Sequence, residues 1–474
     1  MRIFLIWPSK SPEISILISE LEKNLHEIVY WVGFRGGEKY KPLGAIFHDH
    51  VDAWAGLPAE NVDTSSFLPP DEDLIAKLHQ TESHFLTMMN KRYYNMTLDE
   101  RKHVYYNMLQ YWNGIFSKYK PELIIFPNIP HTVYNYLIYE LARLYNIKTI
   151  MFDDTQIGDR ILLLNVWTEG CKALEKEIKN NKDKFYSIED LKIDLREYYI
   201  LHAERRGDAT PEYMKYYKKL STGKNFLFHK FKIFINAIKN GTILEKILNF
   251  LFKLKINPIK EYKKLQIIPD FSKRFIYVPL HFQPERTTSP MGGVYVDQIL
   301  MIETLAAALP DNWFLYVKEH PSQMWINGLN YSSCRYPGYY ERISRIKNTY
   351  LIPFETNSYD LIKNCSAVAT VTGTAGWEAI LRLKPVITFG YSWYRDCSGV
   401  FKVNSTDTCR QAIDNIGKGF RIKEKDVINY LKNLDNASVA SQIDRNVGSI
   451  KRQSNLSDSQ IMINIAQAII NDIK

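Results

Sequence analysis

The second half of this 474-residue chain contains four apolar runs, FIYVPL (Phe275–Leu280), WFLYVKEH (Trp313–His320), AVATVTG (Ala367–Gly373) and PVITFG (Pro385–Gly390). Each run is short and rich in β-branched and aromatic residues, as buried strands are. Helical patterns separate the runs, and this alternation is typical of a parallel sheet. We therefore predict a doubly wound α/β domain that binds its ligand beyond the carboxyl ends of its strands. Its other elements are expected at Val294–Leu309, Thr349–Phe354, Ser358–Asn364 and Ala375–Leu383.

The N-terminal part shows the same alternation. Ile3–Trp7, ELIIFP (Glu122–Pro127) and IKTIMF (Ile147–Phe152) are strand patterns, and Val133–Tyr145 has helical spacing. The last three form a βαβ unit, which implies parallel pairing and a right-handed crossover. The stretch Asp71–Tyr119 is charged and periodic, and we expect helices there. A second Rossmann-like domain is therefore predicted.

The length of the chain is too great for one ordinary core, so several domains are expected. We predict an N-terminal Rossmann-like domain (1–165), a helical Lys-rich insertion or linker (166–268), a C-terminal Rossmann-like domain (269–450) and a C-terminal helix (451–474).

The positive charge of the chain belongs to one segment. Met214–Leu265 contains thirteen lysines and no arginine against two glutamates, although the whole chain carries only +9. The rest of the chain therefore gives no sign of nucleic-acid binding. Phe226–Lys239 and Ile243–Ile256 place apolar residues beside lysines at helical spacing. They are either ordinary packed helices or a basic face, Lys215–Lys264, that docks on anionic lipid.

Several classes of protein are not indicated. The five cysteines form no CxxC pair, which favours a reduced, cytoplasmic compartment without a zinc site. No stretch is long and apolar enough for a membrane span or a signal sequence. We expect a cytoplasmic protein, with peripheral binding at the inner face of the plasma membrane through the Lys-rich segment.

Two loops of the C-terminal domain carry many hydrogen-bonding groups at expected strand ends. HFQPERTTSPMGG (His281–Gly293) follows the first strand, and KEHP (Lys318–Pro321) ends the second. A histidine donates to phosphate, a lysine neutralises it, and a glutamate accepts from hydroxyls. Strand alternation is expected to place Lys318 and His320 on one side and Glu319 on the other. The candidate donor-binding residues here are Gln283, Glu285, Arg286, Thr287, Lys318, Glu319 and His320.

A third loop, TGTAGWEA (Thr372–Ala379), runs from a strand through a tight turn into a helix. Thr372 or Thr374 is expected to cap the helix, whose amide groups and dipole attract anions. The turn is neither a GxGxxG fingerprint nor a GxxxxGK[ST] phosphate loop, which argues against NAD enzymes and P-loop NTPases. The candidate donor-binding residues here are Thr372, Gly373, Thr374 and Glu378.

Two loops of the N-terminal domain are candidates for the chemistry. NIPHT (Asn128–Thr132) and DDTQIGDR (Asp153–Arg160) follow strands expected to be neighbours. His131, Asp153 and Asp154 would then supply a general base or a carboxylate nucleophile. A capping aspartate and an ordinary loop histidine remain the alternative.

HDHVD (His48–Asp52) alternates two histidines and an aspartate along an expected strand. This pattern invites a metal interpretation. Strand-spaced histidines are more often incidental, so no metal site is predicted.

The runs LHFQPERTTSP, YVKEHP and VTGTAGWEAILRLKPVITFG together resemble the bacterial capsule polysaccharide biosynthesis family, which includes Kdo transferases. The resemblance covers about Phe275–Val403, and NIPH more loosely. It implies a GT-B fold, with two Rossmann-like domains facing a cleft, in which the C-terminal domain binds the nucleotide-sugar donor and the N-terminal domain binds the acceptor. It also implies a CMP-activated 2-keto sugar acid such as Kdo as donor, a glycan or glycolipid acceptor, and no required metal or cofactor.

The resemblance also implies residue roles. His320 would contact the donor phosphate, and Thr372–Thr374 would hold that phosphate at the helix start. Glu319 and Glu378 would contact nucleotide or ribose. No residue of the donor domain matches a catalytic carboxylate, which leaves Asp153 or Asp154.

Three other functions remain open. The same lobes are similar to those of CDP-glycerol phosphotransferases, and a sugar-nucleotide 2-epimerase shares the bilobed fold. A non-catalytic nucleotide-sugar-binding or assembly subunit is the third alternative.

Overall fold

The computed structural model describes residues 1–203, 258–324, 334–443 and 454–474. The predicted Lys-rich helices at Phe226–Lys239 and Ile243–Ile256 lie outside these residues. The chain divides into two compact units, which are described separately. Unit 1 comprises Met1–Tyr198, Pro284–Gly293 and Lys425–Lys474, and unit 2 comprises Tyr199–Gln283 and Val294–Glu424.

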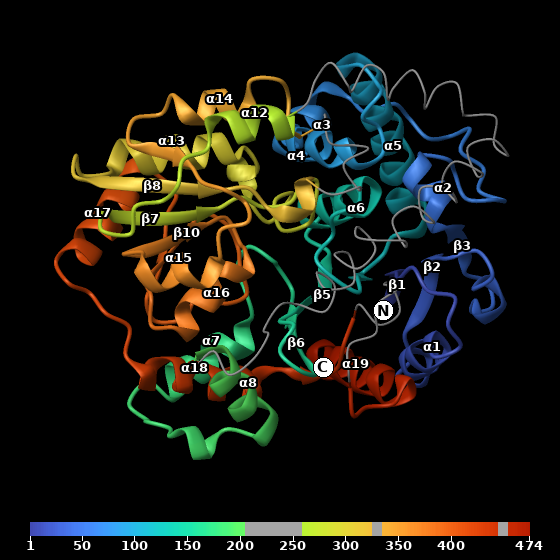
Figure 1. Cartoon of the computed structure of the whole chain (residues 1–474). Coiled ribbons are helices and arrows are strands. Elements are labelled where there is room, and N and C mark those ends of the chain that lie inside the picture. Colours follow the sequence, from blue (N-terminus) through green and yellow to red (C-terminus); the bar gives the residue numbers. More distant parts are fainter. Residues whose placement is uncertain (204–257, 325–333, 444–453) are drawn as a thin grey trace, which may run out of the picture. The chain divides into compact units, whose positions relative to one another are not determined.

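Unit 2 is built on a six-stranded parallel sheet (Figure 1). Its strands are β7 (Arg274–Pro279), β8 (Trp313–Lys318), β9 (Thr349–Leu351), β10 (Ala367–Thr370), β11 (Val386–Thr388) and β12 (Val400–Lys402). The spatial order is β12-β11-β10-β7-β8-β9, so the chain winds outward in both directions from the adjacent strands β7 and β10. This is the predicted doubly wound arrangement. The short edge strand β12 was not predicted.

Helices cover both faces of this sheet (Figure 1). One face carries α12 (Pro258–Leu265), α13 (Gln298–Ala308), α14 (Tyr339–Ser344) and α17 (Thr406–Gly417), and the other carries α15 (Ser358–Asn364) and α16 (Thr374–Leu381). Short 3₁₀ turns η4 (Gly293–Val296) and η5 (Pro321–Met324) follow the first two strands.

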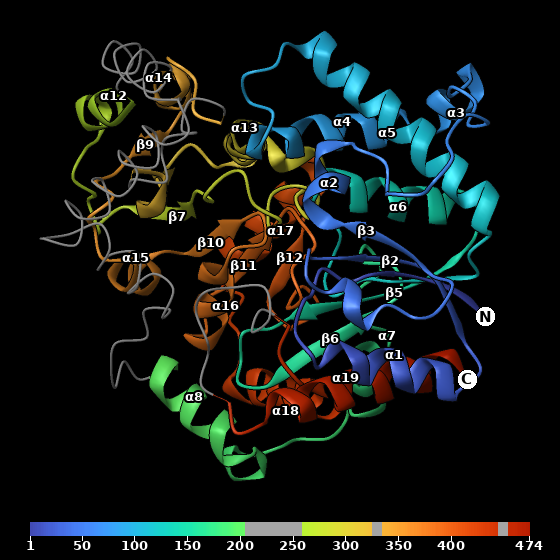
Figure 2. The same ribbon diagram turned by 90° about the vertical axis from the view of Figure 1, so that its right-hand side faces the viewer.

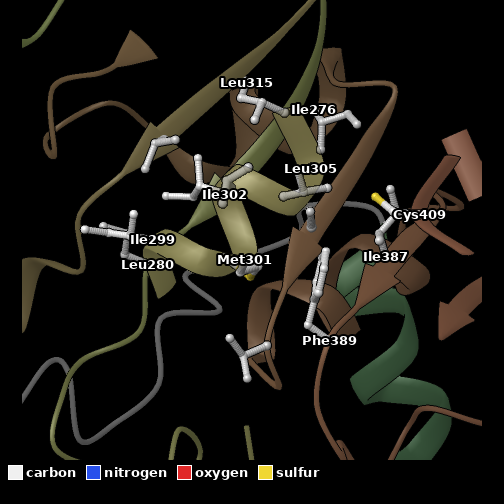
Figure 3. Packing of buried hydrophobic residues seen from close by; sticks show 14 of the residues in the cluster. Ile276, Leu280, Ile299, Met301, Ile302, Leu305, Leu315, Ile387, Phe389 and Cys409 are labelled. Carbon is white, nitrogen blue, oxygen red and sulfur yellow. The ribbon is translucent and has the colours of Figure 1, made fainter. Parts of the chain in front are cut away.

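The core of unit 2 explains why the strands had to be apolar throughout. Ile302 and Leu305 of α13 pack with Ile276, Leu315 and Ile387 of the sheet, and all five side chains are fully buried (Figure 3). Each such burial contributes about 1.5–3 kcal/mol. Because helices cover both faces, the strands show no polar alternation.

Unit 1 holds a seven-stranded sheet in the order β13-β6-β5-β4-β1-β2-β3. Its strands are β1 (Arg2–Ile6), β2 (Glu27–Gly33), β3 (Ile46–Asp49), β4 (Leu123–Ile125), β5 (Lys148–Asp154), β6 (Arg160–Leu164) and β13 (Val439–Ala440). The strands from β3 to β5 are parallel, whereas β6 pairs antiparallel with β5 and β13 pairs antiparallel with β6. The predicted βαβ unit and its parallel pairing are confirmed. The two units thus give the two Rossmann-like sheets of the GT-B type.

Two helices from opposite ends of the chain cover one face of this sheet. Figures 1 and 2 show α1 (Ile14–Lys23) and α19 (Asp458–Ile473) side by side, and their apolar residues share one core with β1, β4 and β5. The helices predicted within Asp71–Tyr119 are α3 (Glu72–Lys77), α4 (His79–Met88) and α5 (Leu98–Tyr119), with η2 (Met89–Lys91) between the last two. The remaining elements are η1 (Glu38–Tyr40), α2 (His50–Ala55), α6 (Val133–Leu144), α7 (Lys172–Asn180), η3 (Ile188–Asp190), α8 (Ile193–Ala203) and α18 (Glu424–Ala437).

Two segments of the predicted C-terminal domain belong to unit 1. Most of α18 does so because Asn433 on this helix accepts a 2.8 Å hydrogen bond from Asn181, and because β13, which follows it, joins the sheet of unit 1. Pro284–Gly293 does so because the Ser289 hydroxyl lies 2.7 Å from that of Thr87. The division therefore differs from the boundaries predicted at 269 and 450. Within the described residues, no helix is both long and apolar enough to cross a membrane.

Candidate functional site

The carboxyl ends of β7, β8 and β10 meet at the point where the winding of unit 2 reverses. β7 and β8 pair over their whole length, ending with Pro279 beside Lys318, and the Leu280 amide donates to the Lys318 carbonyl at 2.8 Å. The residues that follow, His281 and Glu319, are therefore neighbours. Ligands of doubly wound sheets bind at this reversal point.

His281 links the loop after β7 to the turn after β10. Its Nε2 accepts a 3.1 Å hydrogen bond from the Thr372 amide, so the ring proton of the neutral histidine sits on Nδ1. Burial, together with His320 and Arg335, lowers the pKa of His281 to about 3. Sequence reasoning did not single out this histidine, because the contact joins positions 91 residues apart.

The turn after β10 has room only for glycine at position 373. A Cβ there would lie 2.8 Å from the Thr370 hydroxyl oxygen and 3.1 Å from His281 Nε2. Gly373 is also the N-cap of α16 and makes no side-chain cap bond. The expected cap by Thr372 or Thr374 is therefore wrong, since Thr372 is buried and Thr374 is exposed at the first helical position. The first turn of α16 instead offers backbone N–H groups that can donate hydrogen bonds to an anion.

His320 is held as a neutral hydrogen-bond donor. Its Nδ1 accepts from the Ser322 amide at 3.2 Å, which assigns the ring proton to Nε2. Burial and the charges of Lys318 and Arg335 lower its pKa to about 4, against the raising effect of Glu319. Within the described residues, Nε2 has no partner, so it can donate to a ligand.

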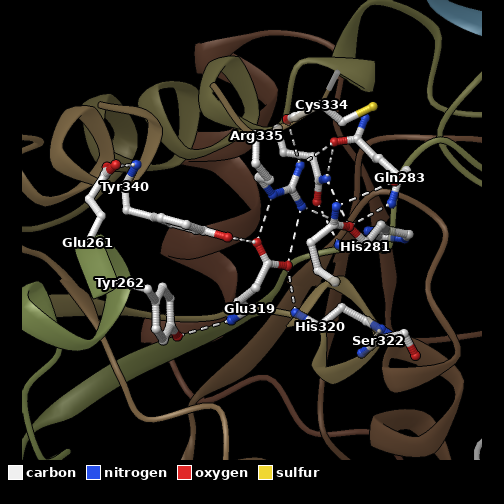
Figure 4. Close-up of polar contacts among 12 residues, drawn as sticks. Glu261, Tyr262, His281, Gln283, Glu319, His320, Ser322, Cys334, Arg335 and Tyr340 are labelled. Carbon is white, nitrogen blue, oxygen red and sulfur yellow. Dashed lines mark hydrogen bonds and ion pairs between the residues drawn. The ribbon is translucent and has the colours of Figure 1, made fainter. Parts of the chain in front are cut away.

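Glu319 and Gln283 both accept hydrogen bonds from Arg335 (Figure 4). The Glu319 carboxylate accepts from Arg335, from the Tyr340 hydroxyl at 2.7 Å and from the His320 amide at 2.6 Å. The Gln283 side chain accepts from Arg335 and from Gln298, both at 2.7 Å. These side chains hold the two loops in place. Because their polar groups are already hydrogen-bonded within the protein, the structure does not favour the predicted contacts of Glu319 and Gln283 with a ligand.

Lys318 and Glu378 lie near the other face of the sheet. The Lys318 ammonium donates to the Ser358 hydroxyl at 2.6 Å and to the Thr356 carbonyl at 2.8 Å, at the start of α15. Burial lowers the pKa of Lys318 to about 8 and raises that of Glu378, beside which Lys318 and Arg382 lie. The ammonium of Lys318 therefore hydrogen-bonds at the start of α15, whereas the carboxylate of Glu319 pairs with Arg335.

The three candidates for the chemistry lie in unit 1, with His131 in the turn before α6 and both aspartates at the end of β5. Nδ1 of His131 donates to the Ile129 carbonyl at 2.9 Å, which leaves the lone pair on Nε2. Burial and the nearby charges of Arg286 and Lys91 lower its pKa to about 3. Asp153 and Asp154, both buried, point to opposite faces of β5 because strand neighbours alternate. They therefore cannot act at one point.

The loop Pro284–Gly293 brings three predicted donor-binding residues into unit 1. A guanidinium nitrogen of Arg286 lies 3.5 Å from the Asp153 carboxylate, and Glu285 lies 4.0 Å from Lys91. Thr287, which follows Arg286 in the chain, is partly buried. Arg286, Asp153 and His131 are thus brought together, although the sequence assigned them to different domains.

The HDHVD pattern is not a strand pattern. β3 ends at Asp49, and His50 begins α2, so the alternation predicted along one strand is wrong. His48 is buried between the Tyr30 hydroxyl (2.8 Å) and the Leu57 carbonyl (2.9 Å), while His50 meets the Tyr134 hydroxyl at 2.7 Å. Among the described ranges of the chain there is no cluster of acidic, histidine and cysteine side chains able to hold a metal ion.

Residues 279–415 match the model of a family described as capsule polysaccharide biosynthesis protein. This match confirms the predicted resemblance over that segment, which contains the loops after β7, β8 and β10. A search of curated proteins found no match.

Solved structures share the arrangement only distantly. KpsC of Thermosulfurimonas dismutans, a β-Kdo 2,7 transferase, is 12% identical with a TM-score of 0.31, over 77% of this chain and 90% of that one. The UDP-GlcNAc 2-epimerase of Methanocaldococcus jannaschii is 12% identical with a TM-score of 0.25, over 99% and 100%. The trehalose-phosphate synthase of Burkholderia vietnamiensis is 9% identical with a TM-score of 0.29, over 100% of both chains. Likenesses this distant assign neither substrate nor activity.

Proposed function

We propose that this chain is a glycosyltransferase that moves a sugar from a nucleotide donor onto a bacterial surface polysaccharide or glycolipid. The observation that carries the proposal is the neutral His320 near His281, the residue that accepts from the turn leading into α16, inside the segment that matches the capsule family. A neutral Nε2–H and helix amides suit a phosphate that stays ionised. The proposed donor is a CMP-activated 2-keto sugar acid such as Kdo.

In the proposed reaction, the bond between the anomeric carbon and the donor phosphate oxygen breaks. The acceptor oxygen forms a bond to that carbon, and the hydroxyl proton moves to a general base. Nε2–H of His320 donates to the phosphate oxygen that gains charge as the nucleoside monophosphate leaves. His131 has its lone pair at neutral pH, and a bound anion would raise its pKa by offsetting Arg286 and Lys91.

His131 is a better candidate for the base than either aspartate. The Asp153 carboxylate is already engaged in an ion pair with the guanidinium of Arg286, 3.5 Å away. Asp154 accepts a 2.8 Å hydrogen bond from the Gln156 amide and lies on the opposite face of β5. We therefore propose that Asp153 positions Arg286 beside His131.

A panel of CMP-, UDP-, GDP- and CDP-activated donors tests the donor assignment. Thermal shift reports binding, and release of the free nucleotide reports hydrolysis or transfer. We expect a response to CMP-sugars. A response confined to UDP-sugars with interconversion of epimers would support the epimerase, and release of CMP from CDP-glycerol would support the phosphotransferase.

Since the leaving group carries a single phosphate, the proposed reaction has no pyrophosphate for a divalent ion to bridge. We expect the transfer rate to be the same in excess EDTA as in magnesium, measured by nucleotide release. A loss of activity in EDTA that magnesium restores would contradict this expectation.

The Lys-rich segment, Lys215–Lys264, is proposed as a peripheral contact with anionic lipid at the cytoplasmic face of the plasma membrane. Its thirteen lysines support the proposal, although only its end, in α12, lies within the described residues. Sedimentation with phosphatidylglycerol vesicles should fall as salt rises. Equal binding to neutral vesicles would contradict an electrostatic contact.

A further inference from the structure

Arg335 uses every N–H group of its guanidinium within the protein (Figure 4). It is completely buried, as is its ion-pair partner Glu319. Nε and one terminal nitrogen donate to the two oxygens of Glu319, at 2.7 and 3.2 Å. The other three hydrogen bonds reach the Gln283 side chain (2.7 Å), the His281 carbonyl (3.0 Å) and the Cys334 carbonyl (3.1 Å).

This one side chain therefore joins three segments that are distant in sequence. They are the loop after β7, the end of β8 and the chain that leads into α14. Tyr340 of α14 completes the group by donating to the same carboxylate. The remaining Glu319 contact is with the amide of His320, at 2.6 Å, so the network ends on the residue proposed to hold the donor phosphate.

The energetics favour a geometric role over a stabilising one. Burying an ion pair carries a desolvation penalty, and replacing such a pair by apolar residues is often neutral for stability. The planar fork of arginine, however, fixes its partners in direction as well as distance. Lysine has a similar charge but only three donors in a different geometry.

We propose that Arg335 is a positioning residue of the donor site, which holds the loops after β7 and β8 so that His320 presents Nε2–H to the ligand. The proposal rests on the proposed function for the identity of that ligand. Four groups act on the His320 ring, namely Lys318, Glu319, Arg335 and His281. Loss of the Arg335 charge would leave Glu319 uncompensated and raise the pKa of His320.

The first test compares Arg335→Lys with Arg345→Lys, a matched control at the C-cap of α14 whose side chain is 75% exposed. We expect Arg335→Lys to keep the fold, by circular dichroism and thermal melting. Its kcat/KM for the donor should fall about 100-fold, as for a small misplacement of a reacting group. KM for the acceptor and the activity of the control should not change.

The double variant Arg335→Met/Glu319→Leu guards against a folding failure, because it leaves no buried charge unpaired. It should fold and show the same loss of kcat/KM. Wild-type kcat/KM in either Arg335→Lys or the folded double variant would overturn the proposal.

Side-chain ¹⁵N NMR of His320 provides a readout that needs no transfer reaction. The wild type should show the Nε2–H tautomer throughout the neutral range. Arg335→Met should titrate at higher pH than the wild type, and Arg335→Lys should show a mixture of tautomers. An unchanged His320 spectrum in both variants would overturn the proposal. A wild type that transfers no sugar would instead contradict the proposed function.

Discussion

At the scale of single residues, the ring nitrogens of the histidines define their possible roles. His320 accepts at Nδ1 and His281 accepts at Nε2, while His131 donates at Nδ1. Each ring is therefore locked in one tautomer by a backbone group, without any carboxylate partner in these bonds. Phosphate binding requires a fixed N–H donor, as in His320. Proton removal requires a fixed lone pair, as in His131.

The role of His320 can be separated from its packing by two substitutions. Asn retains an acceptor near the position of Nδ1 and loses Nε2–H, whereas Gln places an amide N–H near Nε2. We expect His320→Asn to lower kcat about 10²–10³-fold, as for loss of one transition-state donor, and His320→Gln to retain more activity. Steady-state kinetics with the best donor of the panel measures both.

His103→Asn, at an exposed position of α5, is the control and should be as active as the wild type. Equal activity of His320→Asn and the wild type would exclude a contact to the phosphate.

At the scale of elements, the turn from β10 into α16 is set by the space around Gly373. A methyl group there would meet Thr370 and His281, the two side chains that hold the turn. We expect Gly373→Ala to destabilise the protein by about 1–3 kcal/mol and to abolish donor binding in a thermal-shift assay. Gly417→Ala is the matched control, because its new methyl group would meet only Trp313 at 3.9 Å. The control should be neutral or slightly stabilising, since alanine favours a helix.

The C-terminal helix α19 is a structural part of unit 1. Ile465 is 1% exposed in the core shared with α1 and the sheet, whereas Ile463 on the same helix is 44% exposed. Ile465→Ala should cost about 2–5 kcal/mol in urea unfolding, and Ile463→Ala should change stability by about 0.5 kcal/mol or less. Equal, small effects of the two substitutions would show that α19 is not docked in solution.

The residue and element scales also explain which features could be predicted from the sequence. The strands β7, β8 and β10 and the helix Ser358–Asn364 were predictable, because buried runs and cap residues are local signals. His281 and Arg335 were not, since each acts through contacts that depend on which strands are neighbours. Arg286 was placed in the donor domain because it follows β7 in the chain, yet its ion pair is with Asp153 of unit 1.

At the scale of the whole molecule, buried neutral histidines make the fold sensitive to acid. Burial is the first cause of the lowered pKa of each, to about 3 or 4, against 6.5 for an ordinary histidine. The residues concerned are His48, His50, His131, His202, His281 and His320. Below about pH 6.5 the unfolded chain binds a proton at each position that the folded chain does not, so stability is lost as pH falls from there toward the folded pKa values.

Urea unfolding from about pH 7 to about pH 5 should therefore show a falling free energy of unfolding, before most carboxylates are protonated. Proton uptake on unfolding, measured by calorimetry in buffers of different ionisation enthalpy, should approach zero above about pH 7 and rise below it. His48 provides the sharpest single check, since both of its ring nitrogens are bonded inside the protein. His48→Gln should flatten this pH dependence even if it lowers stability at neutral pH. A free energy of unfolding that stays constant between about pH 7 and about pH 5 would contradict the burial of these rings in their neutral form.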